Sequence, residues 1–210
     1  MEEQQTLVLL QPEELRVLGS LIEKSRATPD YYPMTISSLT NACNQKTSRN
    51  PIVNYNEETV NLTLNALKIK GLVSTVTGGS SRTVKYKHNL GIVYPLVPGE
   101  LTVICLLLLR GALTPGEINT NASRLYEFET IEEVQQILQK LASENPPFLK
   151  QLDKKPGQKE ARFIHLFSTG TEEEVFDSPQ NLLPELEQRV EKLEKELEEM
   201  KEMLNLLLNQ

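Results

Sequence analysis

Cysteine, histidine and aromatic residues are scarce in this sequence, and long apolar runs are missing. Two cysteines and two histidines stand among 210 residues, and neither cysteine belongs to a CxxC pair. Such a set supplies neither a disulfide framework nor the usual four ligands of a structural zinc site. The longest apolar run, LTVICLLLL at 101–109, is less than half of the roughly 20 residues that a membrane-spanning helix needs. We therefore expect no metal, no cofactor and no membrane span.

The N-terminus and the motif content exclude further classes. The first residues, MEEQQ, are acidic, whereas a secretory signal begins with basic residues, so we expect a cytoplasmic protein. The sequence contains no glycine-rich phosphate loop, no GxSxG and no HExxH. We therefore expect the protein not to be an enzyme.

Charge is unevenly distributed along the chain. The net charge of the whole chain is −7, which argues against a nucleic-acid binder. However, residues 11–90 hold ten Lys/Arg against six Asp/Glu, whereas residues 171–210 hold four against twelve. The acidity therefore belongs mostly to the C-terminal tail, and the basic first third remains suited to nucleic acid.

Signals for three helices and a hairpin follow one another in residues 11–88. QPEELRVLGSLIEK predicts a helix with Pro12 and two acids in its first turn. Thr35 caps a second predicted helix that reaches Cys43, and Asn56 caps a third that ends at Gly71. LVSTVT and RTVKYKH, on either side of GGSS, then predict a β-hairpin. The inward face of the third helix is predicted to hold Val60, Leu64 and Leu67.

The same order of signals returns from Leu101. LTVICLLLLRG predicts a helix, and Thr114 and Thr130 each begin a capping box of a further helix. FLKQL and EARFIHLF, on either side of KKPGQK, predict a second hairpin. The chain's two histidines, His88 and His165, fall at the same place in the two units.

Three helices followed by a β-hairpin, twice over, form the winged-helix arrangement in tandem. We therefore predict a mainly α-helical α+β fold with winged-helix domains at residues 11–90 and 101–168. Residues 91–100 are rich in proline and glycine and are predicted to be a short linker. An acidic linker at 169–181 and a separate helix at 182–208 complete the predicted organisation.

Cys43 and the basic loop that follows it admit several interpretations. With the second helices superposed, Cys43 matches Ala122, a small residue at an inward position, so we expect a packed thiol and not a reactive one. The loop to Asn56 is longer than its counterpart in the second unit and carries Lys46 and Arg49. It either contacts phosphate or a partner, or it is a solvated turn shaped by Asn50-Pro51.

Several segments resemble a known family. PMTISSLTNACNQKTSRNP, EETVNLTLNALKIKGLV, LTPGEINTNASRLYEF and PGQKEARFIHL are similar to the YceH family of uncharacterised bacterial proteins, in order over residues 10–170. The resemblance implies a tandem winged-helix fold. It implies no biochemical role, because DNA binding in that family is inferred from the fold alone.

The first unit is the better candidate for double-stranded DNA. In a DNA-binding winged helix the third helix enters the major groove and the hairpin follows the backbone. Amides read adenine edges, and lysine holds guanine or phosphate. The candidate contacts are Lys46, Arg49, Asn61, Asn65, Lys68, Arg82, Lys85 and Lys87. We therefore expect a DNA-binding or regulatory protein.

The second unit is less suited to DNA, and protein assembly is the alternative function. Its third helix presents Glu132, Glu133 and three glutamines. Its hairpin offers weaker candidate contacts, namely Lys154, Lys155, Lys159 and Arg162. The alternative is a protein-protein interaction module without DNA binding, as in bacterial condensin accessory subunits, which are also acidic tandem winged-helix proteins.

The tail carries a heptad pattern. Apolar residues alternate spacings of four and three at Leu186, Val190, Leu193, Leu197, Met200, Leu204 and Leu207. Such a seam predicts a parallel coiled coil and hence a homodimer, which would space two basic units for paired half-sites. A single amphipathic helix folded against its own chain is the other interpretation.

Overall fold

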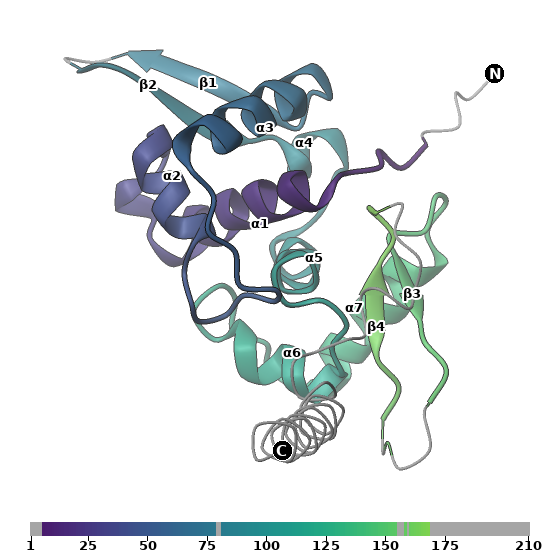
Figure 1. Ribbon diagram of the computed structural model, residues 1–210. Helices are drawn as coiled ribbons and strands as arrows, with labels where there is room; N and C mark the ends of the chain where they lie inside the picture. The colour runs from purple at the N-terminus through teal and green to yellow at the C-terminus, as the bar shows by residue number, and fades with distance from the viewer. Residues whose placement is uncertain (1–5, 79–80, 155–157, 159, 169–210) are drawn as a thin grey trace, which may run out of the picture. The chain divides into compact units, whose positions relative to one another are not determined.

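A computed structural model describes residues 6–78, 81–154, 158 and 160–168. Helices dominate, and two small antiparallel hairpins accompany them (Figure 1). The elements of the first half are α1 (Pro12–Ala27), a 3-10 turn (Pro29–Tyr31), α2 (Ile36–Cys43), α3 (Glu57–Ile69), β1 (Val73–Gly78) and β2 (Ser81–His88). Those of the second half are α4 (Leu90–Val93), α5 (Pro98–Arg110), α6 (Pro115–Ala122), α7 (Ile131–Ser143), β3 (Leu149–Gln151) and β4 (Phe163–His165). The predicted order of three helices and a hairpin, twice, is confirmed.

The two hairpins match each other residue by residue. His88 pairs with Val73, and His165 pairs with Leu149, so each histidine ends its hairpin opposite the first residue of the partner strand. In each repeat the residue before the N-cap of the second helix also forms a bridge to the second hairpin strand. Met34 joins Tyr86, and Leu113 joins Phe163, through reciprocal backbone hydrogen bonds (the two N···O distances are 2.7–3.1 Å). Each hairpin therefore gains a one-residue third strand.

Side-chain caps fix where the helices begin. Thr35, Asn56, Thr114 and Thr130 each accept a hydrogen bond from the backbone N–H three residues on, as expected for N-caps. The predicted box from Thr130 is only half formed, because the carboxylate of Glu133 accepts from the N–H of Glu129 instead. At the other end of α3, Gly71 has φ +74°, which is the left-handed stop that its glycine predicts.

The first helices of the two repeats begin in the same way. Glu14 accepts a hydrogen bond from the N–H of Gln11 at 2.7 Å, and Glu100 accepts one from Val97 at 3.0 Å. Both glutamates are buried, and each also forms an ion pair with a lysine at the end of the third helix: Lys70, the residue after α3, or Lys140 of α7. These capping carboxylates bind the first helix to the third in each repeat.

The predicted linker at 91–100 is wrong in detail. Its first part lies in the short helix α4, and Pro98 begins α5, three residues before the helix expected from Leu101. The sequence Pro98-Gly99-Glu100 repeats Pro12-Glu13-Glu14, a proline at the first helical position with a glutamate two residues later. That match shows a helix start where composition alone suggests a linker.

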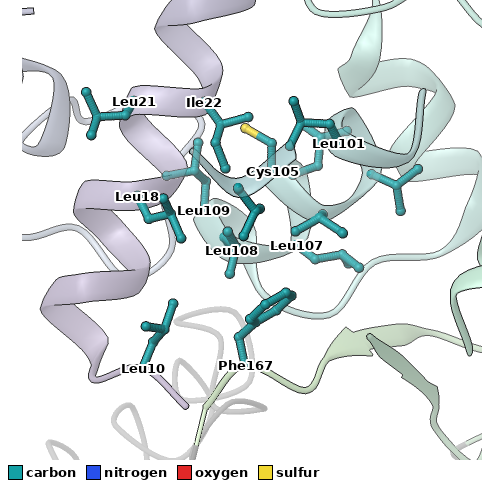
Figure 2. Packing of buried hydrophobic residues seen from close by; sticks show 14 of the residues in the cluster. Leu10, Leu18, Leu21, Ile22, Leu101, Cys105, Leu107, Leu108, Leu109 and Phe167 are labelled. Carbon is teal, nitrogen blue, oxygen red and sulfur yellow. The ribbon is translucent and has the colours of Figure 1, made fainter. Parts of the chain in front are cut away.

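Helix α5 is buried along nearly its whole length and packs against α1. Every residue from Gly99 to Leu109 is buried. Figure 2 shows Leu108 and Leu109 of α5 on the side of α1 that carries Leu18 and Ile22, whereas Leu21 points to the other side of α1. One hydrophobic cluster contains side chains of both repeats, and residues 1–170 form one compact unit. The two repeats are thus joined through a shared core.

The ends of this unit are also joined. The N–H of Leu10 donates to the carbonyl of Phe167 at 2.7 Å, and both side chains are buried (Figure 2). The N–H of Val8 donates to the hydroxyl of Tyr94 at 3.0 Å. The predicted linker at 169–181 and the heptad helix at 182–208 lie outside the described residues.

Candidate nucleic-acid interface

Helix α3 packs one face on the core and presents the other to solvent. The buried face holds Val60, Thr63, Leu64 and Leu67, which confirms the predicted apolar positions. The exposed face holds Glu57, Glu58, Asn61, Leu62, Asn65, Lys68 and Ile69. At about 100° per residue these seven positions cover one continuous arc, with Asn65 near its middle. The structure therefore places the predicted amides and Lys68 together on one accessible surface.

The polar side chains on this arc are partly ordered by one another. Lys68 donates from Nζ to Oδ1 of Asn65 at 3.2 Å, across one helical turn. The contact orients the amide so that its NH₂ group points away from the lysine. Neither residue is buried, so both remain accessible to a ligand.

The first hairpin contacts this helix through β1 and carries its lysines on β2. Lys87 is exposed and Lys85 is half-buried, on β2, and β1 contacts α3 (Figure 1). Within the described part of the chain, no hydrogen bond or ion pair engages the ammonium groups of Lys46, Lys85 or Lys87. The side chain of Arg82 lies outside the described residues. Among the described side chains of the first repeat, Lys46, Lys68 and Lys87 are exposed cations, and Lys85 is half-buried.

Arg49 does not belong to this surface, which corrects the sequence prediction. Its side chain is fully buried and forms a two-pronged ion pair with Glu23 of α1, at 2.9 and 2.6 Å. It also donates to the carbonyl of Ala42 and to the side chain of Gln45. All of its donors face the protein, so Arg49 binds the loop after α2 to α1 and has none left for a phosphate.

The loop around Arg49 is anchored to the second repeat. The N–H of Asn50 donates to the carbonyl of Leu109 in α5 at 2.8 Å. Arg16 of α1 donates to the carbonyls of Cys43 and Pro51, which hold the start and the middle of the loop. Hydrogen bonds from α1 and to α5 therefore hold the loop in place. Lys46 is its exposed basic residue.

The ion pair also sets the charge state of Glu23. Burial raises the pKa of this carboxyl, but hydrogen bonds and charge from Arg49, with help from Lys24, outweigh burial and leave the pKa below its ordinary value. Glu23 therefore stays ionised, and the pair is kept at neutral pH.

The second hairpin uses its arginine internally. Arg162 donates to both carboxylate oxygens of Glu117, at 2.9 and 2.8 Å, and to the carbonyl of Ala112 at 2.8 Å. It fixes the start of α6 to the hairpin, so the predicted DNA contact by Arg162 does not fit its position. Lys154 is exposed, whereas Lys155 and Lys159 lie outside the described residues.

Comparison of the repeats exposes one difference in their hairpins. Lys85 precedes the bridge residue Tyr86, as Arg162 precedes the bridge residue Phe163, so the two cations occupy matching places. The partner of Arg162 is the third residue of α6, and the third residue of α2 is Ser38, which carries no charge. The second repeat neutralises the cation at this position with Glu117, and the first leaves the matching Lys85 accessible.

The cysteines and histidines are part of the core. Burial raises the pKa of the Cys43 thiol to about 11 and also raises that of Cys105, so both stay protonated. The packed position predicted for Cys43 is confirmed. Burial likewise lowers the pKa of His88 and of His165 to about 4, and Nδ1 of each is buried without a hydrogen-bond partner. Across the residues that the structure describes, no cluster of three potential metal ligands occurs.

Comparison with known proteins identifies the family. Residues 10–158, which include all of the described helices, match the family described as "Protein of unknown function, DUF480". The chain belongs to the DUF480 family. The family description assigns no activity, which agrees with the expectation of an uncharacterised bacterial family, whereas the YceH name stays a prediction.

Several relatives of the DUF480 chain align over nearly their full lengths. A "UPF0502 protein" of Shewanella piezotolerans is 43% identical over 209 residues, which cover 93% of this chain and 96% of the relative. A "UPF0502 protein" of Shewanella pealeana is 44% identical over 213 residues, with 95% and 99% covered. The described helices of this chain include none with the length and apolar character needed to cross a bilayer.

Proposed function

We propose that this protein is a tandem winged-helix protein that binds double-stranded DNA through its first repeat. In each repeat the chain runs from a helix through a one-residue strand to two helices and a hairpin, which is the order of elements in a winged-helix domain. This order makes α3 the helix for the major groove and the β1–β2 hairpin the wing that follows the backbone.

One observation carries the proposal: the first hairpin leaves Lys85 and Lys87 accessible, while the second ties Arg162 to Glu117. A cation that holds the fold together is already neutralised, whereas an accessible one releases counterions when it meets a phosphate. Lys68 and Lys46 add two exposed charges to the same repeat. The first repeat therefore has the chemistry of a phosphate-binding surface.

The fold gives the two repeats different roles. The second repeat supplies α5, which buries the inner face of α1 and holds the loop before α3 through Leu109. Its own third helix, α7, exposes Glu132, Gln135, Gln136 and Gln139, and the exposed Lys140 beside them is paired with Glu100. We therefore propose that the first repeat contacts DNA and that the second repeat stabilises the first.

The test is a titration of fluorescent duplex DNA with the full-length protein at several salt concentrations. The proposal predicts tight binding at low salt and a steep decline of the association constant as salt rises. A variant with glutamine at positions 46, 68, 85 and 87 should bind much more weakly and keep its helical content by circular dichroism. Absence of binding by the unmodified protein at low salt would overturn the proposal.

A second candidate function is docking onto another protein. Two apolar residues of the α3 arc are exposed, Leu62 by 65% and Ile69 by 89%. Both lie along one edge of the arc, and the buried core of a protein contact is built from such apolar side chains. If the titration shows no DNA binding, serine at both positions should reduce an assembly that sedimentation detects.

The heptad pattern at 186–207 supports a homodimer, which would present two first repeats to paired half-sites. We propose in this sense a dimeric, non-enzymatic regulator that acts in the cytoplasm. Sedimentation of the full-length chain, with Leu193→Asp and Leu197→Asp as the disrupting variant, measures its oligomeric state.

A further inference from the structure

The exposed arc of α3 carries amide and apolar side chains as well as charged ones, and their arrangement on the helix is defined. Asn61 and Asn65 lie four residues apart, so they stand one above the other on the helix surface. Leu62 lies beside Asn65, three residues before it and 65% exposed, at the edge of the arc, and Lys68 lies three residues after Asn65. Two amides near the middle of the face therefore have an apolar side chain beside them.

Each of these groups matches a feature of one kind of base pair. An asparagine amide makes two hydrogen bonds to adenine, donating to N7 and accepting from N6. An apolar side chain in the major groove meets the 5-methyl group of thymine. Adenine and thymine edges therefore complement the amide row and Leu62 at once, whereas a G·C pair offers no methyl group.

The hydrogen bond between Lys68 and Asn65 also favours adenine as the partner of Asn65. Lys68 donates to Oδ1 of Asn65 and leaves both Nδ2 hydrogens free to donate outward. Oδ1 keeps a second lone pair, so it can still accept from an adenine amino group. Asn65 thus arrives in the groove with its amide already oriented, and less conformational entropy is lost on binding.

We infer that α3 reads A·T base pairs in the major groove, with Asn61 and Asn65 on adenine and Leu62 on the thymine methyl group. This inference rests on the proposed DNA binding by the first repeat and specifies the ligand of that surface. Lys68 acts as a positioning residue for Asn65. The hairpin lysines supply affinity without reading sequence.

The experiment compares duplexes that differ by single chemical groups. Full-length protein is titrated with fluorescent duplexes of about 20 base pairs, two helical turns: one of A·T pairs, one of G·C pairs and one in which deoxyuridine replaces every thymidine. Removal of a contacted methyl group should weaken binding about fourfold, the value of one buried carbon. Leu62→Ala should bind the thymidine and deoxyuridine duplexes equally.

A second substitution in the DNA tests the amides. Exchange of adenine for 7-deazaadenine removes the N7 acceptor and should weaken binding by about fivefold or more, since a bidentate contact discriminates by about 1–3 kcal/mol. Asn65→Ala should lose this sensitivity. Lys87→Gln, the control, should weaken binding to all duplexes alike and retain both sensitivities.

The outcomes separate this inference from the function on which it rests. Salt-sensitive binding that is equal for all the duplexes overturns base reading by α3 and leaves DNA binding by the first repeat in place. Binding to none of them overturns both. Persistent sensitivity to the methyl group in Leu62→Ala, with circular dichroism unchanged, overturns the assignment of Leu62.

Discussion

Cys105 places its sulfur 3.4 Å from the carbonyl oxygen of Gly19, and each is the eighth residue of its helix, α5 or α1. Equivalent positions of the two repeats therefore meet at the centre of the contact between them. A two-fold axis produces such self-contacts in a homodimer. Within one chain, the same arrangement lets two repeats bury their first helices against each other.

Gly19 is needed for this close approach. A Cβ there would lie 2.9 Å from Cγ and Cδ2 of Leu109 and 3.3 Å from Cβ of Leu108. Gly19→Ala should therefore destabilise the protein by about 1–2 kcal/mol, because overpacking outweighs the gain in helix propensity. Urea unfolding measures the loss. Gly91→Ala, whose Cβ would meet its nearest atom at 3.8 Å, is the control and should change stability little. Equal midpoints for both variants would contradict the packing argument.

Arg49 holds the loop after α2 and not a ligand. Its substitution by alanine leaves the half-buried carboxylate of Glu23 without its main partner, so we expect a loss of about 3 kcal/mol in the free energy of unfolding. Lys46→Ala, in the same loop but exposed, should change it by less than about 0.5 kcal/mol. Thermal unfolding of both variants measures the two losses of stability. A phosphate-binding role without a structural one predicts little loss of stability in either variant.

The buried histidines should make the protein sensitive to mild acid. Burial lowers the pKa of His88 and His165 to about 4, below the ordinary value near 6.5. Between these values the unfolded chain binds protons that the folded chain does not, so stability is complete above about pH 6.5 and falls toward pH 4. The slope is at most about 1.4 kcal/mol per pH unit for each histidine.

Two measurements check the acid sensitivity. Stability from urea unfolding between pH 7 and 5 should decline, and His165→Leu should roughly halve the decline, because one of two protonating rings is gone. Nuclear magnetic resonance of the imidazole rings reports the pKa values directly. Ring titrations with midpoints near 6.5 would contradict burial of neutral histidines.

The first repeat should not fold by itself. Fragment 1–95 lacks α5, so the face of α1 that carries Leu18 and Ile22 would meet water, and Asn50 would lose its acceptor on Leu109. We expect this fragment to lack cooperative thermal unfolding, whereas fragment 1–170, the whole compact unit, unfolds cooperatively. A sharp transition in fragment 1–95 would show that the repeats are independent domains.

Local signals in the sequence predicted most elements correctly. The caps Thr35 and Asn56, the inward positions of α3 and the matched histidines depend on short-range chemistry, which the sequence displays directly. The structure of the junction between the repeats was predicted less well, since a run of prolines and glycines resembles a linker. The repeated Pro-x-Glu at the two helix starts was the available signal for α5.

The candidate site was predicted only in part, because the sequence does not show whether a basic residue forms an ion pair within the folded chain. Arg49 and Lys46 look alike in the sequence, but the ion pair with Glu23 spans 26 residues and forms only in the folded chain. The same holds for Arg162 and Glu117. Asn61, Asn65 and Lys68 were placed correctly because the helical period alone decides which face they share.

The most direct test of the account compares the two hairpins in the full-length protein. Lys85→Gln with Lys87→Gln removes two charges from the first hairpin, and Lys150→Gln with Lys154→Gln removes two exposed charges from the second hairpin region. The salt dependence of duplex binding is measured for both. The first pair should reduce the slope of the logarithmic salt plot by about 2, and the second should leave it near that of the unmodified protein. Equal slopes for the two variants, or a loss confined to the second, would contradict DNA binding by the first repeat.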